Sequence, residues 1–340
     1  MKIGIAFDLK PKSPAPANAP DDMYEEFDNL DTIEALAKVF RQRGHEVVSL
    51  GGGREFIEAV LKSAPDLVFN LSEGHGISRS RESRVPAVCE MLNIPYCGSD
   101  PLTLGLALDK DLARRTVEDA DVMIAPGIVL QFPEQKYDGD MSEFASMLTE
   151  SQLTLPVIVK PTCEGSSKGI RNKCLIKNAE DFGPTVISLW HDYKQPVLVE
   201  EFIEGHEVTV GITGNGSSAE VFGALQIVPR KPTREFVYSL EVKRDWKNQV
   251  EYASPPKLPR ETLNALDNAA LAAYDILGCR DFARIDFRIR DGIPYFLEAN
   301  PLPGLNPDTG DICLIAQLQG VPYEALIGKI LDAAIARLGL

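Results

Sequence analysis

The sequence has no apolar run that approaches the ~18 residues needed to span a membrane, and charge interrupts its start too early for a secretory signal. Positive charge is also scarce. There are 35 Lys and Arg residues against 50 Asp and Glu residues, which gives a formal net charge of −15. So acidic a chain does not suit duplex nucleic acid or anionic lipid. We therefore expect a cytoplasmic protein that binds neither nucleic acid nor a membrane.

Cysteine and histidine motifs for metal binding are missing. The 6 cysteines are spread along the chain without a C-x-x-C pair, which fits neither a zinc site nor a small disulfide framework. We expect these thiols to be reduced and mostly buried. The 4 histidines show no H-x-x-H or H-E-x-x-H spacing, which argues against a histidine-based metal centre.

The chain length and the periodicity of apolar residues predict an α/β protein with two or three domains. Residues 1–98 alternate short apolar strands with helices, a pattern typical of a parallel sheet covered by helices. Asp31 and Glu34 have capping-box spacing at the start of one of these helices. A helix is expected over 101–120, with Lys110 near its middle. We place the boundaries of three parts at 1–98, 99–198 and 199–340.

The segment Val159–Gly169 joins a strand to a loop of small residues. Lys160 lies at the end of the strand, and two glycines and two serines follow it. Glycine allows a close backbone approach to an anion, and successive N–H groups can surround phosphate oxygens. The lysine precedes the glycines, so the spacing is not that of a P-loop. These residues alone fit a phosphate-binding loop and a plain Gly/Ser surface loop equally well.

A second segment, Val197–Val210, contains an acidic turn between two apolar strands. The first strand ends in Glu200 and Glu201, and the second begins at Glu207. A purine can use the backbone of such a hinge while a carboxylate accepts from ribose hydroxyls. Taken alone, the segment fits a solvated acidic hairpin better, because charged turns are common.

The segment Arg284–Gly304 consists of two alternating strands around Arg-Asp-Gly, which predicts a hairpin. A three-residue loop would pair Arg284 with Glu298. It would also pair Asp286 with Phe296 and place both carboxylates on one face. A two-residue Asp-Gly loop would put these carboxylates on opposite faces. We favour the three-residue loop.

Strand alternation then adds Asn300 to the face that carries Asp286 and Glu298. Two carboxylates and an amide oxygen form a hard oxygen site that suits Mg²⁺. The alternative is a polar, solvent-facing side of the hairpin. The prolines after Asn300 favour the metal site, because they would hold the ligands rigidly.

Together these segments resemble the ATP-grasp superfamily and, within it, the D-alanine–D-alanine ligase family. Leu92–Ser99 and Ala107–Lys110 are also similar to that family, so the resemblance runs from about Asp66 to the end of the chain. It implies an ATP-grasp fold with an N-terminal parallel α/β domain and two α+β lobes that enclose the nucleotide. It also implies an ATP-dependent ligase that joins two D-alanines, or similar small amino acids, through an acyl phosphate. A role in peptidoglycan biosynthesis and a homodimer follow from the same resemblance.

The resemblance implies roles for individual residues. ATP would be bound by Lys110, Lys160, Ser166, Ser167, Glu200, Phe202, Ile203, Glu207 and Lys243, and two Mg²⁺ (or Mn²⁺) ions by Asp286, Glu298 and Asn300. In catalysis, Arg284 and the N–H of Gly304 would stabilise an oxyanion, and Ser166 would belong to a polar relay. Glu26 would hold the first substrate's ammonium. Thr309 would contact the second substrate's carboxylate.

Two departures from the family pattern lie on the substrate side. Arg244 follows Lys243 where the family commonly has a tyrosine. The family's His-Gly segment with its acidic pair reads Glu73-Gly74-His75-Gly76, followed by Arg79–Glu82. ATP use is thus better supported than D-alanine.

Three alternatives remain. A ligase on the same scaffold could use another amino acid or a hydroxy acid. The protein could be a nucleotide-binding module without catalysis, but such a module would not need all three of the metal ligands Asp286, Glu298 and Asn300. The protein could also be a nicotinamide-dependent dehydrogenase, but the G-x-G-x-x-G motif that should then follow the first strand is missing from the sequence.

Overall fold

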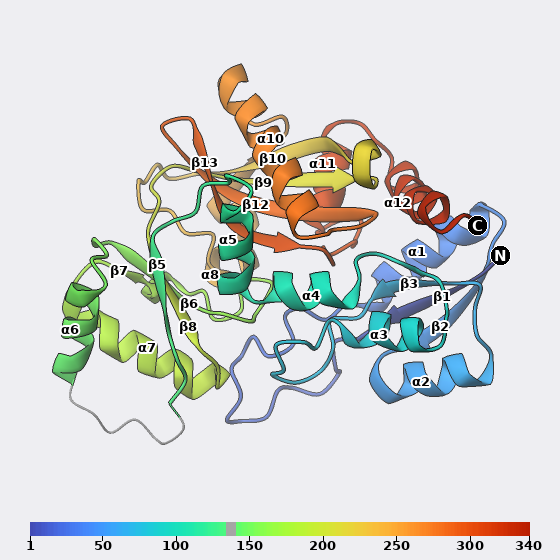
Figure 1. Cartoon of the computed structure of the whole chain (residues 1–340), viewed down its shortest axis with the longest axis horizontal. Coiled ribbons are helices and arrows are strands. Elements are labelled where there is room, and N and C mark those ends of the chain that lie inside the picture. The colour runs from blue at the N-terminus through green and yellow to red at the C-terminus, as the bar shows by residue number, and fades with distance from the viewer. Residues whose placement is uncertain (134–140) are drawn as a thin grey trace.

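The computed structural model describes residues 1–133 and 141–340. Their strands form three separate sheets, which lie side by side along the molecule with helices packed against them (Figure 1). No helix within this described part is both long and apolar enough to cross a membrane.

The first sheet is parallel, as predicted, with the strand order β2-β1-β3-β4. Its strands are β1 (Lys2–Phe7), β2 (Glu46–Gly51), β3 (Leu67–Leu71) and β4 (Tyr96–Cys97), and its helices are α1 (Leu30–Gln42), α2 (Gly53–Lys62) and α3 (Arg84–Met91). The capping box expected at Asp31 is wrong. Helix α1 begins one residue earlier, and the side chain of Asn29 accepts from the backbone N–H of Thr32 at 2.9 Å.

The middle sheet is antiparallel, with the order β5-β8-β6-β7. Its strands are β5 (Gly127–Leu130), β6 (Val157–Pro161), β7 (Leu175–Ile176) and β8 (Val197–Glu201), and its helices are α6 (Met141–Glu150), η1 (Asn172–Cys174) and α7 (Ala179–Tyr193). Helices α4 (Pro101–Leu108) and α5 (Lys110–Glu118) precede this sheet in the chain but pack against β13 (Ile293–Asn300) of the third sheet. The single helix expected over 101–120 is wrong. It breaks at Asp109, whose carboxylate accepts from the N–H groups of Asp111 and Leu112. Lys110 is therefore the first residue of α5.

The third sheet is also antiparallel, with the order β11-β10-β9-β12-β13. Its strands are β9 (His206–Thr213), β10 (Glu220–Pro229), β11 (Val250–Ala253), β12 (Phe282–Arg290) and β13 (Ile293–Asn300). The remaining helices are η2 (Gly216–Ser218), α8 (Leu240–Arg244), α9 (Trp246–Gln249), α10 (Arg260–Ile276), α11 (Asp311–Leu318) and α12 (Tyr323–Leu338).

The β12–β13 hairpin differs from the predicted register. Its loop is the two-residue turn Asp291-Gly292, with φ values of 53° and 82°, and not the expected three-residue loop. A β-bulge at Leu297 then shifts the pairing, so that Asp286 lies opposite Glu298. Because directly paired residues share a face, the bulge keeps both carboxylates on the same side of the sheet.

The hydrophobic core of the first sheet extends to the C-terminal helices. Ile327, Ile330 and Leu331 of α12 are buried in one cluster with Ile33 and Phe40 of α1. Both chain termini lie at this end of the molecule (Figure 1). All six cysteines are buried and free, as expected. The boundaries 1–98, 99–198 and 199–340 stay a proposal.

A buried carboxylate links the first sheet to the C-terminal part of the chain. Asp281 is fully buried and accepts from Arg337 of α12 through Nε at 2.9 Å and Nη2 at 2.7 Å. It also accepts from the backbone N–H of Gly98 at 2.8 Å and the side-chain amide of Asn215 at 2.9 Å. The removal of one partner of such a pair leaves the other charge buried without compensation.

We predict that Asp281→Ala lowers the free energy of unfolding by about 3–5 kcal/mol, the usual cost of breaking a buried ion pair. Urea denaturation measures this change. The control Asp275→Ala removes an exposed carboxylate of α10 and should alter stability by less than about 0.5 kcal/mol. Equal stability of the two variants would show that the Asp281 network contributes little.

Candidate active site

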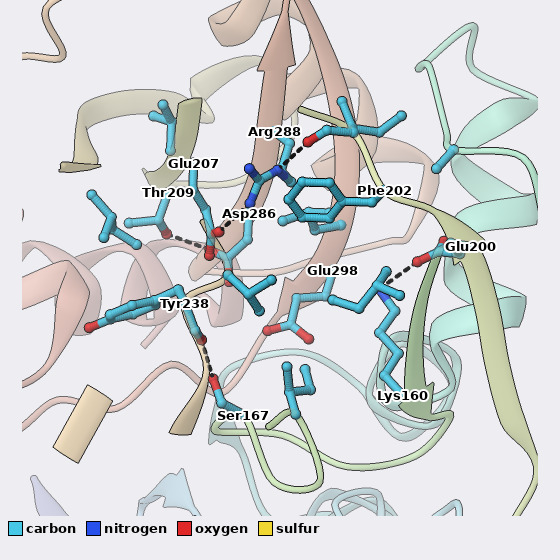
Figure 2. A pocket seen from close by; sticks show the side chains of 18 of the residues that line it. Lys160, Ser167, Glu200, Phe202, Glu207, Thr209, Tyr238, Asp286, Arg288 and Glu298 are labelled. Atoms are coloured by element: carbon cyan, nitrogen blue, oxygen red, sulfur yellow. Dashed lines mark hydrogen bonds and ion pairs between the residues drawn. The ribbon is translucent and has the colours of Figure 1, made fainter. Parts of the chain in front are cut away.

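The main cavity lies between the middle and third sheets and, counting its open mouth, has a volume of about 860 Å³. Strands β6 and β8 line one side, and β9, β12 and β13 line the other (Figure 2). Apolar side chains such as Ile158, Phe202 and Val208 form much of its wall, and charged side chains from both sheets also line it. A mostly apolar cleft with a few placed polar groups is typical of a small-molecule site.

Arg288 of β12 organises the hinge that follows β8. Its Nε donates to the carbonyl of Ile203 at 2.6 Å, and its Nη1 donates to Glu207 at 2.8 Å and to the carbonyl of Phe236 at 2.9 Å. The guanidinium also lies 4.5 Å from the centre of the Phe202 ring (Figure 2). Arg288 was not among the predicted site residues, although strand alternation places it on the same face as Asp286.

A buried ion pair lies on the opposite wall of the cavity. Lys160 Nζ lies 2.6 Å from Glu200 Oε2, and both side chains are almost wholly buried (Figure 2). The expected loop lysine and hinge carboxylate therefore meet across β6 and β8, which pair directly. The lysine charge is thereby held at the cavity, where an anionic ligand could share it.

The paired carboxylates of the hairpin converge at the edge of the main cavity. Arg284 donates to Asp286 in a bidentate manner, at 2.9 Å from Nε and 2.8 Å from Nη2. Its Nη1 donates to Asp311 at 3.0 Å. Lys110 Nζ lies 3.0 Å from Glu298 Oε2. Two buried cations thus compensate the carboxylates.

These contacts shift the acidity of the two carboxyls in opposite directions. Burial alone would raise the pKa of Glu298, but the charges of Lys110 and Arg284 lower it to about 2. Burial raises the pKa of Asp286, and the nearby charge of Glu298 adds to the effect despite Arg284.

The donor set fits the predicted metal. Asp286 and Glu298 supply hard carboxylate oxygens on one face, and the Asn300 side chain lies beside them, with Nδ2 3.3 Å from Asp286 Oδ2. Across residues 1–133 and 141–340 there is no group of three or more His, Cys, Asp or Glu side chains that could hold a metal ion. Any bound Mg²⁺ would therefore depend on oxygens from the ligand as well.

The small-residue loop after β6 separates two cavities. Ser166 and Ser167 both adopt left-handed backbone conformations, with φ values of 50° and 60°. Ser167 lines the main cavity and donates to the carbonyl of Tyr238 at 3.3 Å (Figure 2). Ser166 lines a second cavity of about 620 Å³. Arg284 and Glu298 line both cavities, so the two spaces meet at these side chains.

The second cavity contains the residues expected to act on the substrates, except Thr309, together with Lys110 of the expected nucleotide site and Asn300 of the expected metal site. Glu26, Lys110, Ser166, Asn300 and Gly304 line it, together with the unpredicted Glu73, Glu82 and Glu164. Lys110 was expected to bind ATP, but it lines this second cavity and does not line the main cavity. Lys110 Nζ also donates to the carbonyl of Glu164.

Glu26 is already engaged by two cations. Arg81 donates to it at 2.8 Å and Lys168 at 3.0 Å, and the N–H of Gly165 donates to it at 2.5 Å. Burial favours the neutral carboxyl, but Arg81 and Lys168 outweigh it and lower the pKa of Glu26. The carboxylate is therefore ionised and well compensated without a substrate.

Thr309 does not join the site. It is exposed, it lines neither of the two cavities, and its hydroxyl donates to Asn306 Oδ1 at 3.1 Å. The other expected nucleotide residues, Phe202, Ile203, Glu207 and Lys243, do line the main cavity.

Arg244, which replaces the family tyrosine, points toward the N-terminal part of the chain. Its Nη1 donates to Asp21 at 2.6 Å and its Nη2 to Glu25 at 3.0 Å. The preceding Lys243 lies 5.7 Å from the centre of the Tyr238 ring. Helix α8 thus contacts the segment that leads to Glu26.

Three sheets with a cleft between the last two, and a carboxylate pair at its edge, define the ATP-grasp class. The fold is similar to that of D-alanine–D-alanine ligase from Bacillus anthracis, with a TM-score of 0.73, 21% identity and coverage of 99% of this chain and 98% of that chain. It is also similar to that of the VanG D-Ala:D-Ser ligase from Enterococcus faecalis, with a TM-score of 0.70, 21% identity and coverage of 98% of this chain and 99% of that chain.

Sequence comparison specifies the family. The family model described as D-ala D-ala ligase C-terminus matches residues 117–332. A D-alanine–D-alanine ligase of Aquifex aeolicus is 31% identical over 313 residues, covering 89% of this chain and 94% of that protein. One of Geotalea uraniireducens is 30% identical over 311 residues, covering 91% and 92%. The chain belongs to the D-alanine–D-alanine ligase family, and the predicted family and fold class are confirmed.

Glu82 gives the stability of the protein a defined dependence on pH. Burial, with added repulsion from Glu26, raises the pKa of Glu82 from 4.5 to about 8 despite Arg81. The neutral carboxyl thus stabilises the fold fully below about pH 4.5, and this stabilisation is lost as the pH rises toward about 8.

We predict that the free energy of unfolding falls more steeply with pH in the wild type than in Glu82→Gln between about pH 4.5 and 8. The difference in slope is at most about 1.4 kcal/mol per pH unit, the value for one proton. Urea denaturation at several pH values measures it. The exposed control Glu118→Gln should follow the wild type, and parallel wild-type and Glu82→Gln curves would contradict the prediction.

Proposed function

We propose that this protein is an ATP-dependent carboxylate–amine ligase that joins two D-alanines, or similar small amino acids, and releases ADP and phosphate. The single observation that carries the proposal is the convergence of Asp286, Glu298 and Arg284 where the two cavities meet. A nucleotide in the main cavity would present its terminal phosphate to an amino acid in the second.

The reaction has two balanced steps. A carboxylate oxygen of the first amino acid attacks the γ-phosphorus of ATP, and the bond to the leaving oxygen of ADP breaks. The nitrogen of the second amino acid, after losing its ammonium proton to solvent, attacks the acyl carbon of the resulting acyl phosphate. The carbon–oxygen bond then breaks, and the phosphate leaves with one of the remaining amine protons.

The residues on the page suit these steps. The hinge backbone and Glu207, both held by Arg288, would bind the nucleoside, and Lys160 would neutralise phosphate charge. Arg284, together with the N–H of Gly304, would stabilise the negative charge that develops on the acyl oxygen. Glu26 would contact the first substrate's ammonium only as part of its network with Arg81 and Lys168.

Asp286, Glu298 and Asn300 would hold one or two Mg²⁺ ions, with Mn²⁺ as a substitute. The metal would supply charge neutralisation on the transferred phosphoryl group. The family resemblance also supports the proposals of a homodimer and of a cytoplasmic location.

The direct test is phosphate release from ATP and Mg²⁺ across a panel of D- and L-amino acid pairs, with the products identified by mass. We expect release to depend on a pair of amino acids and a product that is their sum less one water. Tight ATP binding without turnover for any pair would favour the non-catalytic module.

We predict that Glu298→Gln lowers the rate of phosphate release by at least ~100-fold, because the metal and the phosphoryl group lose a compensating charge. Circular dichroism and ADP binding check that the variant is folded, since Lys110 also loses its partner. Glu118→Gln serves as the exposed control with unchanged rate. Retained activity in Glu298→Gln would refute the metal assignment.

A further inference from the structure

Two carboxylates in the second cavity have no partner in the described part of the chain. Glu73 and Glu82 both line this cavity, and neither lies within hydrogen-bond or ion-pair distance of another described side chain. Glu82 is only 7% exposed. A side chain buried to this degree usually has its polar atoms satisfied, so the cavity side of Glu82 is where a partner is missing.

The other acidic residues of the same cavity are compensated. Glu26 forms ion pairs with Arg81 and Lys168, and Glu164 forms one with Lys168. Glu298 forms ion pairs with Lys110 and Arg284. The side-chain amide of Gln195 also donates to Glu164 at 2.7 Å.

The nearby cations are fully used by these contacts. Arg81 divides its donors between Glu26 at 2.8 Å, Glu164 at 3.5 Å and the carbonyl of Cys163 at 2.7 Å. Lys168 is held between Glu26 and Glu164. Neither Arg81 nor Lys168 therefore pairs directly with Glu73 or Glu82, and the more distant charge of Arg81 offsets their burial only in part. Two ionised carboxylates in a buried cavity are unfavourable without a directly paired cation.

We propose that Glu73 and Glu82 bind a cationic group on the side chain of one amino-acid substrate, so that this ligase prefers an amino acid with an amino or guanidino side chain. The inference rests on the proposed ATP-dependent ligase chemistry and replaces one of its two small amino-acid substrates with a basic amino acid. Charge complementarity in a buried cavity selects strongly, because a neutral side chain leaves the carboxylates unpaired.

The location of these carboxylates fits a side-chain site. The same cavity contains Arg284 and Gly304, which would face the reacting acyl group, while Glu73 and Glu82 come from the segment between β3 and α3. An amino acid whose carboxyl or amine reacts beside Arg284 could extend its side chain toward that segment. Burial and the charge of Glu82 raise the pKa of Glu73, which is the state expected of a carboxyl that lacks its cation.

A bound metal ion is the less suitable occupant. The residues that the structure describes contain no set of three His, Cys, Asp or Glu side chains arranged for a metal, so the Glu73 and Glu82 pair has no third such ligand. An ammonium or guanidinium group needs only hydrogen-bond acceptors and negative charge, which these two carboxylates provide.

The test compares lysine, ornithine and arginine with norleucine, the neutral analogue of lysine, and with alanine. Each is supplied as either enantiomer, together with ATP, Mg²⁺ and a second amino acid. We expect kcat/KM for phosphate release to be at least ~10-fold higher with a basic amino acid than with norleucine. Calorimetric titration of lysine and norleucine into the ADP-bound enzyme provides a readout that does not require turnover.

Glu82→Gln and Glu73→Gln keep the side-chain shape and remove the charge. We expect each to reduce the ratio of the lysine rate to the norleucine rate by at least ~10-fold, and Glu118→Gln to preserve it. These ratios are insensitive to a partial loss of folded protein, because both substrates are measured on the same sample.

The outcomes separate the two proposals. Equal or better use of norleucine or alanine by the wild type, or a lysine preference that survives in Glu82→Gln and Glu73→Gln, would overturn the inference and leave the ligase function intact. Absence of phosphate release with every amino acid would overturn the ligase function. In that case, equal calorimetric affinity for lysine and norleucine would overturn the inference as well, and a lysine preference lost in Glu82→Gln would support it.

Discussion

Asp286 and Glu298 carry like charges at directly opposed positions of two neighbouring strands, an arrangement that is unfavourable unless cations compensate it. Arg284 and Lys110 supply that compensation from β12 and from the start of α5. Because Arg284 and Glu298 line both cavities, the same ion pairs lie at the boundary between the two cavities. The bulge at Leu297 is what permits the pairing, so the site depends on one unpaired residue in β13.

The two cavities differ in their charge balance. In the main cavity Lys160 pairs with Glu200 and Arg288 pairs with Glu207, and each pair joins two strands. In the second cavity Glu73 and Glu82 form no ion pair with a described residue. The charges that line the main cavity are therefore balanced within the protein, whereas the second cavity contains carboxylates that form no ion pair within the described part of the chain.

Local patterns predicted the parts of the fold that depend on local structure. The alternating strands of residues 1–98 are encoded by periodicity and were predicted. The two-residue turn at Asp291-Gly292 was the alternative that we did not favour, although Asp-Gly is a preferred sequence for such turns. The break at Asp109 could have been found, since Asp is a preferred N-cap residue. The bulge at Leu297 could not, because register depends on how both faces of the sheet pack and not on the hairpin alone.

Site residues whose roles depend on distant partners were harder to predict. Arg288 is defined by the carbonyls of Ile203 and Phe236, 85 and 52 residues away along the chain. The compensation of Glu26, and the lack of compensation at Glu82, likewise depend on where Arg81 and Lys168 lie in space. A motif identifies a carboxylate, but only the fold shows whether its charge is already neutralised.

Helix α8 carries two adjacent residues that serve different neighbours. Lys243 lines the main cavity, and Arg244 forms ion pairs with Asp21 and Glu25, just before Glu26. A movement of α8 away from the nucleotide must break these exposed pairs, at a cost of at most about 1 kcal/mol each. If a ligand in the main cavity holds α8 in place, these pairs would carry that order to the segment before Glu26, and thermodynamic reciprocity would make the effect equal in both directions.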